Sequence, residues 1–392
     1  MSEIAIAIIG GGVIGCAVAQ ELSKRYQGIY LFEKNPGITR GENQSSRNSG
    51  VIHSGIYYDR ETRPFKATFC VEGNSLLYEF CEDHRVPALK TGKLIVATTE
   101  NEDQVLDIYL QRAKENGVPD VDKLSNREIR AMEANVKGRS ALHIPSAGIV
   151  DPAALVYRLH TLAQRNGVQT LTGTEVVEIQ GQGDSMELTL CYPDGTVDQT
   201  RSRIVVNASG VNADRVARQI DPTSPYELDP IRGESYKYYS HKRPELALAG
   251  RNIYPTPQSV MTAHGRHFTV GVHLTPTFED LSVPPRLGST VTVGPILVPA
   301  KNRSDVVEVP VPAEDFVSKV HPFFPGLKRD DLIWHQAGLQ ARLKNHPDFI
   351  IQPDNQYSHV FNLLGVDSPG LTSCLAIARR VARYLETLGL TS

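Results

Sequence analysis

The hydrophobic pattern at the start of the chain predicts a strand, a glycine-rich turn, a helix and a second strand. Residues 4–9 form a short apolar run that stops at three glycines, and residues 13–25 carry the three- and four-residue spacing of a helix. A second apolar run, 28–33, ends in a glutamate. This order of elements is typical of the opening of a doubly wound parallel sheet.

The middle of the chain predicts a return to this sheet. Residues 153–164 have a helical pattern and follow an acidic N-cap, Asp151, and a proline at the first helical position, Pro152. Runs of β-forming residues then predict a strand at 175–179, a hairpin over 188–197 and a strand at 204–207. These elements extend the first β–α–β unit.

Two other segments do not follow that pattern. Residues 74–132 are mostly helical in pattern with a strand at 94–98, and residues 228–316 form β-rich segments with many prolines. We therefore predict an α/β fold in which a Rossmann-like cofactor-binding domain is interleaved with an α+β, sheet-based substrate domain. The first domain is assigned residues 1–75, 145–225 and 330–392, and the second is assigned 76–144 and 226–329.

Composition agrees with a globular protein of this size. The chain has 392 residues, of which 40% are hydrophobic and 22% charged, so it is long enough for two domains. Its 41 Lys and Arg against 44 Asp and Glu give a net charge of −3, without a long basic run. We therefore expect no nucleic-acid partner.

The cysteine and histidine pattern predicts no metal site. The five cysteines are scattered without a C-x-x-C pair, which favours reduced thiols in a reducing compartment. His264 and His267 have a spacing that could share a metal, but no third ligand is evident. The apolar run 4–19 is broken by glycines and lacks a preceding basic segment, which argues against a signal peptide or membrane span. We expect a cytoplasmic protein and leave peripheral contact with a membrane open.

The first turn carries a dinucleotide-binding fingerprint. Gly10, Gly12 and Gly15 form G-x-G-x-x-G between the predicted strand and helix, and Glu33 ends the second strand. In this motif the glycines permit a tight turn, close approach to a pyrophosphate and close helix–strand packing, and the acid binds a ribose hydroxyl. NAD and FAD both fit, whereas Glu33 would repel the 2′-phosphate of NADP.

Three further places could hold a flavin ring. The stretch SSRNSGVIHSGIYY (45–58) has no helix or strand period, is rich in hydroxyls and carries His53 between two glycines. The buried run 204–207 stops in small residues, and 365–373 precedes the terminal helix, whose N-terminus would face the electron-rich edge of a reduced flavin. Each of these three segments, taken alone, also suits a tight turn.

Together these residues resemble the D-amino-acid-oxidase-like family of FAD-dependent oxidoreductases, and within it most closely the L-2-hydroxyglutarate dehydrogenase/oxidase group. The resemblance covers nearly the whole chain. It rests on the fingerprint and on the segments SSRNSGVIHSGIYY, KA (66–67) with CVEG (70–73), VVNASGVNAD, IRGESY, IYPTP, GVHLTP, VGP and NLLGVDSPGLTSCLAIA.

The resemblance implies FAD as the cofactor. The residues expected to bind it are Gly10, Gly12, Val13, Ile14, Gly15, Glu33, Lys34, Ser45, Ser46, Asn48, Ser49, Gly50, Val51, Val176, Ala208, Ser209, Gly210, Gly338, Gly365, Ser368, Pro369, Gly370, Leu371 and Thr372.

The resemblance also implies a reaction. A flavin would take a hydride from the hydroxyl-bearing carbon of a small 2-hydroxy acid and pass electrons to a quinone or to oxygen. His53 is the candidate base; alternatively it orients the flavin ring or is a core histidine. Tyr254, His273 and Arg232 lie in segments resembling the family's second sheet, although a structural role is open for each, such as Arg232 pairing with Glu234.

The chain departs from the family at the position of its substrate-clamping arginine. Gln340 stands there, and Arg342, two residues on, is a candidate substitute if this segment is a strand. The stretches 62–67 and 294–297 also differ from close relatives. These departures keep open another 2-hydroxy acid or an amino acid as the substrate. The alternative functions are an amine or amino-acid oxidase, a glycerol-3-phosphate dehydrogenase-like enzyme and, outside enzymes, a dinucleotide-binding regulator.

Overall fold

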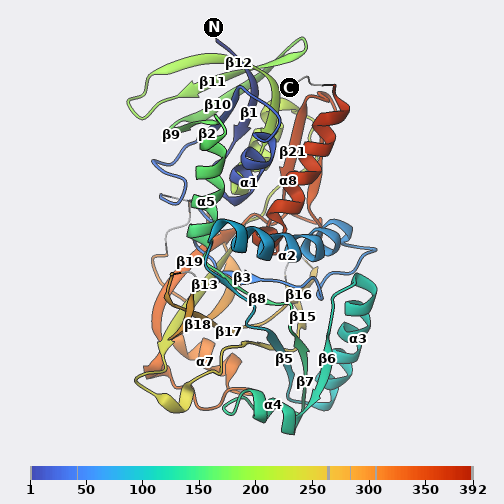
Figure 1. The fold of residues 1–392 in the computed structure, drawn as a ribbon, viewed down its shortest axis with the longest axis vertical. Coiled ribbons are helices and arrows are strands. Elements are labelled where there is room, and N and C mark those ends of the chain that lie inside the picture. Colours follow the sequence, from blue (N-terminus) through green and yellow to red (C-terminus); the bar gives the residue numbers. More distant parts are fainter. Residues whose placement is uncertain (1, 42, 263–264, 283, 305–306, 390–392) are drawn as a thin grey trace.

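The computed structural model describes residues 2–41, 43–262, 265–282, 284–304 and 307–389. Two eight-stranded sheets form the framework, and each is assembled from segments far apart in the sequence. One sheet lies in the upper half of Figure 1 with the chain termini, the other lies in the lower half, and helix α2 (Pro64–His84) runs between them.

The first sheet contains the predicted nucleotide-binding strands. In spatial order it runs β10 (Glu175–Gln182), β11 (Ser185–Cys191), β12 (Val197–Asn207), β1 (Ser2–Ile9), β2 (Ile29–Glu33) and β9 (Gln169–Thr172), with β21 (Val360–Leu364) beside the end of β12 and β20 (Ile350–Pro353) beside β21. Strands β9, β2, β1, β12 and β21 pair in parallel, whereas β10, β11 and β12 pair antiparallel. Strand β12 joins the outgoing arm of the predicted hairpin to the predicted strand 204–207 in one continuous element.

Helices cover both faces of this sheet. Helix α1 (Val13–Leu22), α5 (Pro152–Arg165) and α8 (Gly370–Thr387) share one apolar core with β1 and β21, and α2 packs on α8. Helix α6 (Ala213–Ile220) belongs to the apolar cluster on the other face. The start of α5 follows the sequence prediction, because the Asp151 carboxylate accepts a hydrogen bond from the Ala154 N–H at 2.6 Å.

The second eight-stranded sheet lies below the first one in the view of Figure 1. Its order is β19 (Ile333–Gln340), β13 (Ile231–Tyr239), β18 (Arg286–Pro299), β17 (His273–Asp280), β14 (Asn252–Pro255), β5 (Lys93–Ala97), β7 (Ser140–Ile144) and β6 (Asp122–Ser125). Helix α3 (Glu100–Asn116) packs on one face, and α4 (Asn126–Met132) and α7 (Ala313–Val320) join the core on the other. Strand β19, which the sequence division places in the cofactor domain, pairs with β13 in this sheet.

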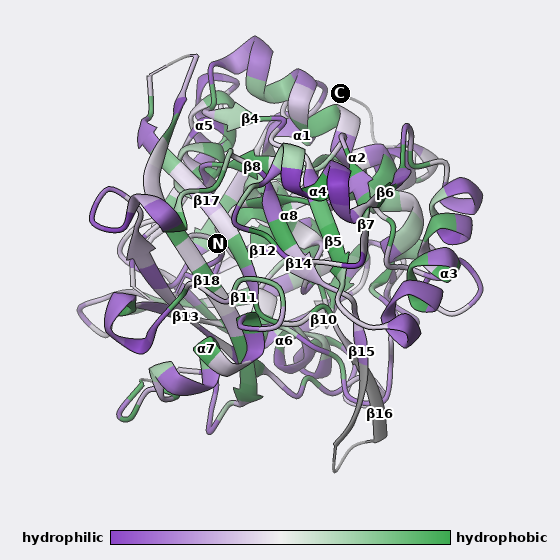
Figure 2. Ribbon diagram, turned by 90° about the horizontal axis from the view of Figure 1, so that it is seen from below, coloured by the Kyte–Doolittle hydropathy of each residue, from purple (hydrophilic) through white to green (hydrophobic). Residues whose placement is uncertain are grey.

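Shorter elements connect the two layers. Strands β3 (Val51–Ile52), β8 (Gly148–Val150) and β4 (Ala88–Leu89) form a small sheet, and β15 (Gln258–Thr262) pairs with β16 (Gly265–Thr269). The 3₁₀ turns are η1 (Gly210–Asn212), η2 (Pro244–Leu246) and η3 (Arg329–Asp331). Figure 2 shows hydrophobic segments gathered toward the centre and hydrophilic ones on peripheral helices such as α3. None of the helices described is long and apolar enough to cross a lipid bilayer.

Candidate active site

A cavity of about 1240 Å³ is lined by residues of both large sheets. The first sheet contributes Ile9 and Phe32 from the carboxyl ends of β1 and β2, where open parallel sheets bind their ligands. The second sheet contributes Tyr254, His273 and Gly338. The fold therefore brings the predicted cofactor and substrate segments to one place.

The three fingerprint glycines have different physical roles. Gly10 has a φ of +106°, and a Cβ there would lie 2.5 Å from the carbonyl oxygen of Ala208. A Cβ on Gly15 would lie 1.8 Å from the carbonyl oxygen of Gly10, so close packing of α1 on β1 requires glycine. A Cβ on Gly12 would approach only the Ser45 hydroxyl, at 3.1 Å. Because Gly12 lines the cavity, its backbone is open to a cofactor phosphate, in the way the fingerprint predicts.

Two of the predicted cofactor ligands also organise this loop. The Glu33 carboxylate accepts hydrogen bonds from the N–H of Gly11 at 2.7 Å and the N–H of Asn35 at 2.8 Å. The Ser45 hydroxyl accepts one from the N–H of Val13 at 2.8 Å, a donor in the first turn of α1. Both side chains line the cavity. The loops after β2 and before β3 are therefore held against the start of α1.

Most of the predicted cofactor residues lie at the cavity wall. They are Gly10, Gly12, Val13, Ile14, Glu33, Lys34, Ser45, Asn48, Ser49, Val51, Val176, Ala208, Ser209, Gly210, Gly338, Gly365, Ser368, Pro369, Gly370 and Leu371. Gly15, Ser46, Gly50 and Thr372 are outside the lining. A Cβ on Gly50 would lie 2.4 Å from the carbonyl oxygen of Val150, so this glycine serves backbone packing.

His53 is anchored through its backbone beside the cavity. Its N–H donates to Thr372 Oγ1 at 3.0 Å, and its carbonyl oxygen accepts from Asn74 Nδ2 at 2.9 Å. The ring nitrogen Nε2 lies 3.4 Å from Ser368 Oγ, and Ser368 lines the cavity. The other nitrogen, Nδ1, is buried and has no hydrogen-bonding partner among the described residues. Nε2 is therefore the nitrogen on the cavity side.

The surroundings of His53 favour an uncharged imidazole. Burial, assisted by the neighbouring Lys93 and His273, lowers the pKa of His53 well below its ordinary value of 6.5. A neutral imidazole at pH 7 can accept a proton. The candidate base is thus in the protonation state that its predicted role requires.

Tyr254 and His273 form a stacked pair in the cavity wall. Their ring centroids are 3.9 Å apart and the ring planes differ by 9°. His273 Nδ1 lies 3.2 Å from the carbonyl oxygen of Gly271, so we assign the hydrogen to Nδ1. Burial lowers the pKa of His273 to about 3 and raises the pKa of Tyr254 well above its usual range. Both rings are therefore uncharged near pH 7.

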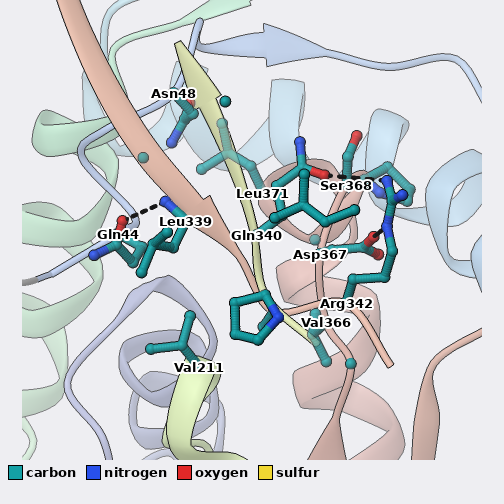
Figure 3. A pocket seen from close by; sticks show the side chains of 18 of the residues that line it. Gln44, Asn48, Val211, Leu339, Gln340, Arg342, Val366, Asp367, Ser368 and Leu371 are labelled. Carbon is teal, nitrogen blue, oxygen red and sulfur yellow. Dashed lines mark hydrogen bonds and ion pairs between the residues drawn. The ribbon is translucent and has the colours of Figure 1, made fainter. Parts of the chain in front are cut away.

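Arg342 lies in a group of charged side chains at the cavity (Figure 3). Its Nε is 3.7 Å from Asp367 Oδ2, and its Nη2 is 3.4 Å from Gln340 Oε1. Lys66 Nζ lies 2.7 Å from Asp367 Oδ1. Strand β19 ends at Gln340, so Arg342 reaches this place from the following loop and not by strand alternation. The Asp348 carboxylate, which accepts hydrogen bonds from the backbone N–H of Phe65 and Lys66, lies beside this group. Arg342 contacts Asp367 through Nε and Gln340 through Nη2, so its guanidinium has further N–H donors for a substrate carboxylate.

Arg232 is not among the residues that line the cavity. Its guanidinium contacts the Glu234 carboxylate, with Nη2 at 2.7 Å and Nε at 3.0 Å from Oε1. Glu234 is fully buried, and a buried carboxylate needs such a partner. The position of Arg232 therefore agrees with the structural alternative, an ion pair with Glu234, and not with a place at the cavity wall.

Lys66 and Asp367 line the cavity but are not among the site residues predicted from the sequence. Lys66 lies on α2 and Asp367 lies just before α8, so their ion pair depends on the packing of two helices distant in sequence. A lysine near a helix N-terminus and an aspartate in a turn are ordinary on their own. Only a contact prediction between these segments could have revealed them.

Among the residues described, no three His, Cys, Asp or Glu side chains cluster as a metal site. The five cysteines are free. His264, considered above as a metal ligand with His267, lies outside the described residues, and the same applies to the side chain of His267.

A G-x-G-x-x-G turn, two neutral histidines and residues of a second sheet lining one cavity are together typical of a dinucleotide-dependent oxidoreductase. The space that a Cβ on Gly12 would fill, and the start of α8 at the cavity wall, suit the pyrophosphate and ring of a flavin dinucleotide.

The chain belongs to the DAO family of FAD-dependent oxidoreductases, whose model, described as FAD dependent oxidoreductase, matches residues 5–384. Its cofactor is FAD, and the prediction of a FAD-dependent enzyme is confirmed. The chain is 30% identical to a mitochondrial L-2-hydroxyglutarate dehydrogenase of Arabidopsis thaliana, covering 96% of this chain and 82% of that one. It is 28% identical to an L-2-hydroxyglutarate dehydrogenase of Indibacter alkaliphilus, covering 97% and 98%. Among solved structures, the dithionite-reduced, FAD-bound L-α-glycerophosphate oxidase of Mycoplasma pneumoniae matches with a TM-score of 0.84 and 26% identity, covering 98% and 95%.

Proposed function

We propose that this protein oxidises L-2-hydroxyglutarate to the 2-oxo acid, with FAD as the hydride acceptor. The observation that carries the proposal is that one cavity is lined both by His53, a neutral imidazole whose Nε2 lies 3.4 Å from the cavity-lining Ser368, and by Arg342, which can bind a carboxylate. Whole-length similarity to L-2-hydroxyglutarate dehydrogenases supports this choice of substrate.

The protein residues supply positioning and proton transfer. FAD, when bound, supplies the acceptor for the hydride that leaves carbon 2. His53 Nε2 takes the proton of the substrate hydroxyl, which lets the carbon–oxygen double bond form. Arg342 and Lys66, partly balanced by Asp367, hold a substrate carboxylate. The Tyr254–His273 stack forms an uncharged wall that limits where the substrate can move.

Anaerobic bleaching of the flavin tests the substrate. We expect L-2-hydroxyglutarate to remove the visible flavin absorbance of the purified protein, and D-2-hydroxyglutarate and L-amino acids to leave it. The likeness to a glycerophosphate oxidase structure makes glycerol 3-phosphate the second candidate. Bleaching by glycerol 3-phosphate or by an amino acid, without bleaching by L-2-hydroxyglutarate, would contradict the proposal.

Electrons leave the reduced flavin for a quinone or for oxygen in this proposal. Mixing the bleached protein with air or with a water-soluble quinone distinguishes the two, because the better acceptor restores the flavin absorbance faster.

We place the protein in a reducing compartment such as the cytoplasm, since its cysteines are free.

Replacing Arg342 with methionine should weaken substrate binding. Loss of a charged hydrogen-bonding group is expected to raise KM for L-2-hydroxyglutarate by roughly 10–100-fold, with a smaller change in kcat. Steady-state kinetics with an artificial electron acceptor measure both. The matched control is R139M, which removes an exposed arginine paired with Glu100. An unchanged KM in R342M would remove Arg342 from the substrate site.

The pH dependence should reflect the lowered pKa of His53. Because burial keeps the imidazole unprotonated below pH 6.5, the rate of flavin reduction should stay nearly constant down to that pH and fall only below it. The free energy of unfolding should also decrease as the pH falls below 6.5, because His53 binds a proton there in the unfolded chain and stays neutral in the folded state. Stopped-flow absorbance at saturating substrate measures the rate. A decline with its midpoint above pH 6.5 would show that another group controls it.

A further inference from the structure

Lys93 is a buried lysine that the mechanism above does not use. It is the first residue of β5, and its side chain is 0% exposed. Within the described ranges, its Nζ has no hydrogen-bonding partner and no ion pair is found for it. Burying an unpaired amine opposes folding. A lysine at this position therefore suggests a role other than stability.

The Lys93 amine lies against an aromatic ring of the cavity wall. Its Nζ is 4.0 Å from the centroid of the Tyr254 ring and 5.1 Å from that of Tyr57. Tyr254 also stacks on His273, with centroids 3.9 Å apart. Since both partners approach one centroid this closely, they must occupy opposite faces of the ring. The three side chains form a stack in the order Lys93, Tyr254, His273, and the last two line the cavity.

Among the described residues, the titratable groups found to interact with Lys93 are the Cys70 thiol on α2, the Tyr57 phenol after β3, the Tyr254 phenol on β14, and the imidazoles of His53 and His273. The phenols of Tyr58 and Tyr109 interact in turn with Tyr57. Burial raises the pKa of the thiol and of the four phenols, so none of these groups carries a negative charge near pH 7. Burial first, and Lys93 in addition, lowers the pKa of both imidazoles. Burial also lowers the pKa of Lys93 from 10.5 to about 7.

We propose that Lys93 is a positioning residue, which holds the Tyr254–His273 stack at the cavity and whose protonated amine opposes protonation of His53 and His273. The proposal rests on the proposed hydroxy-acid oxidation, because it concerns the state of the candidate base. Like charges repel strongly in a buried, low-dielectric setting. Below neutral pH, where an ordinary histidine gains a proton, the Lys93 ammonium keeps the base free.

Replacing Lys93 with methionine tests the buried charge without any substrate. Methionine keeps the unbranched stem and removes the amine. The unfolded chain keeps its lysine proton up to about pH 10.4, whereas the folded state releases it near pH 7. Raising the pH from 7 to 9.5 should therefore stabilise the wild type relative to K93M. The melting temperature of K93M, measured relative to that of the wild type at the same pH, should be lower at pH 9.5 than at pH 7 by roughly 2 °C or more.

The matched control is K90M, in the same segment. Lys90 is exposed, and its Nζ lies 4.8 Å from the ring centroid of Tyr78. K90M therefore removes the same charge and the same kind of contact from the surface, and the difference between its melting temperature and that of the wild type should not change with pH. If the melting-temperature difference between K93M and the wild type were equally independent of pH, the proposal would be overturned.

The pH profile of flavin reduction tests the effect on the base. In K93M the acidic pH at which the rate of flavin reduction falls should rise by about one unit, so that at a pH below both pKa values reduction is slower than in the wild type by up to about 10-fold. In K90M the rate should fall at the same acidic pH as in the wild type. If K93M folds and binds FAD but its rate also falls at the wild-type pH, Lys93 has a packing role only.

Failure of the proposed function is separable from failure of this inference. If no hydroxy acid bleaches the wild-type flavin, the proposed function fails, while the melting measurements still test Lys93. If K93M does not fold, NMR of the wild type with ¹³C-labelled lysine replaces it. One lysine signal should titrate near pH 7, and its absence would overturn the inference.

Discussion

Replacing His53 with alanine slows flavin reduction by L-2-hydroxyglutarate roughly 10²–10⁴-fold, the usual contribution of a general base. The physical reason is that His53 Nε2 takes the substrate proton from the cavity side, and alanine offers no acceptor there. The backbone bonds to Thr372 and Asn74 do not need the ring, so H53A should fold and keep FAD. Anaerobic stopped-flow absorbance gives the rate, and the visible spectrum of the purified protein gives the FAD content.

The control for this variant is H241A. His241 is exposed and its Nδ1 lies 3.0 Å from Ser289 Oγ, away from the cavity lining. H241A should reduce at the wild-type rate. If H53A reduced at that rate as well, His53 would be a structural histidine. If H53A instead lost FAD, the alternative that His53 orients the flavin would be favoured.

Replacing Gly12 with valine weakens FAD binding by a factor of roughly 10² or more, because a branched side chain occupies the cradle of the pyrophosphate. A Cβ on Gly12 meets only the Ser45 hydroxyl, at 3.1 Å, so the apoprotein should tolerate the change better than it would at Gly10 or Gly15. FAD affinity is measured by the quenching of flavin fluorescence when apoprotein is titrated into free FAD.

The control for the cradle is G37V. Gly37 lies outside the cavity lining, and the three atoms nearest to a Cβ there belong to the flexible side chain of Arg40, at 3.4 Å or more. G37V should bind FAD as the wild type does. Equal affinity in G12V and G37V would mean that the cofactor phosphate does not approach Gly12.

Local sequence was sufficient for the dinucleotide-binding half of the protein. The fingerprint glycines, Glu33 and the strands on either side are close together in the chain, so their spacing alone encodes the turn, the helix start and the acid. The Asp151 cap and Pro152 fixed the start of α5 in the same way. Such features could be predicted because their physical causes act over a few residues.

Sheet membership was harder to predict, since it depends on pairing between distant segments. Strand β19 has the length and pattern of a strand in either sheet, and only its pairing with β13 assigns it to the second one. Likewise, Arg342 was expected on the same face as Gln340 only if the strand continued to residue 342, and β19 ends at Gln340. A periodic pattern identifies a strand but carries no information about its neighbour.

By itself, the sequence determined the cofactor class, the β–α–β opening and His53 as the candidate base, because these depend on short motifs and on a family resemblance along the whole chain. Only the tertiary structure decided that Arg232 binds Glu234, that Arg342 and Lys66 share Asp367, and that Lys93 stacks on Tyr254. The physical reason is that charge pairing and burial are set by side chains brought together from separate strands and helices. Their effects on protonation follow from that packing and leave no local pattern in the sequence.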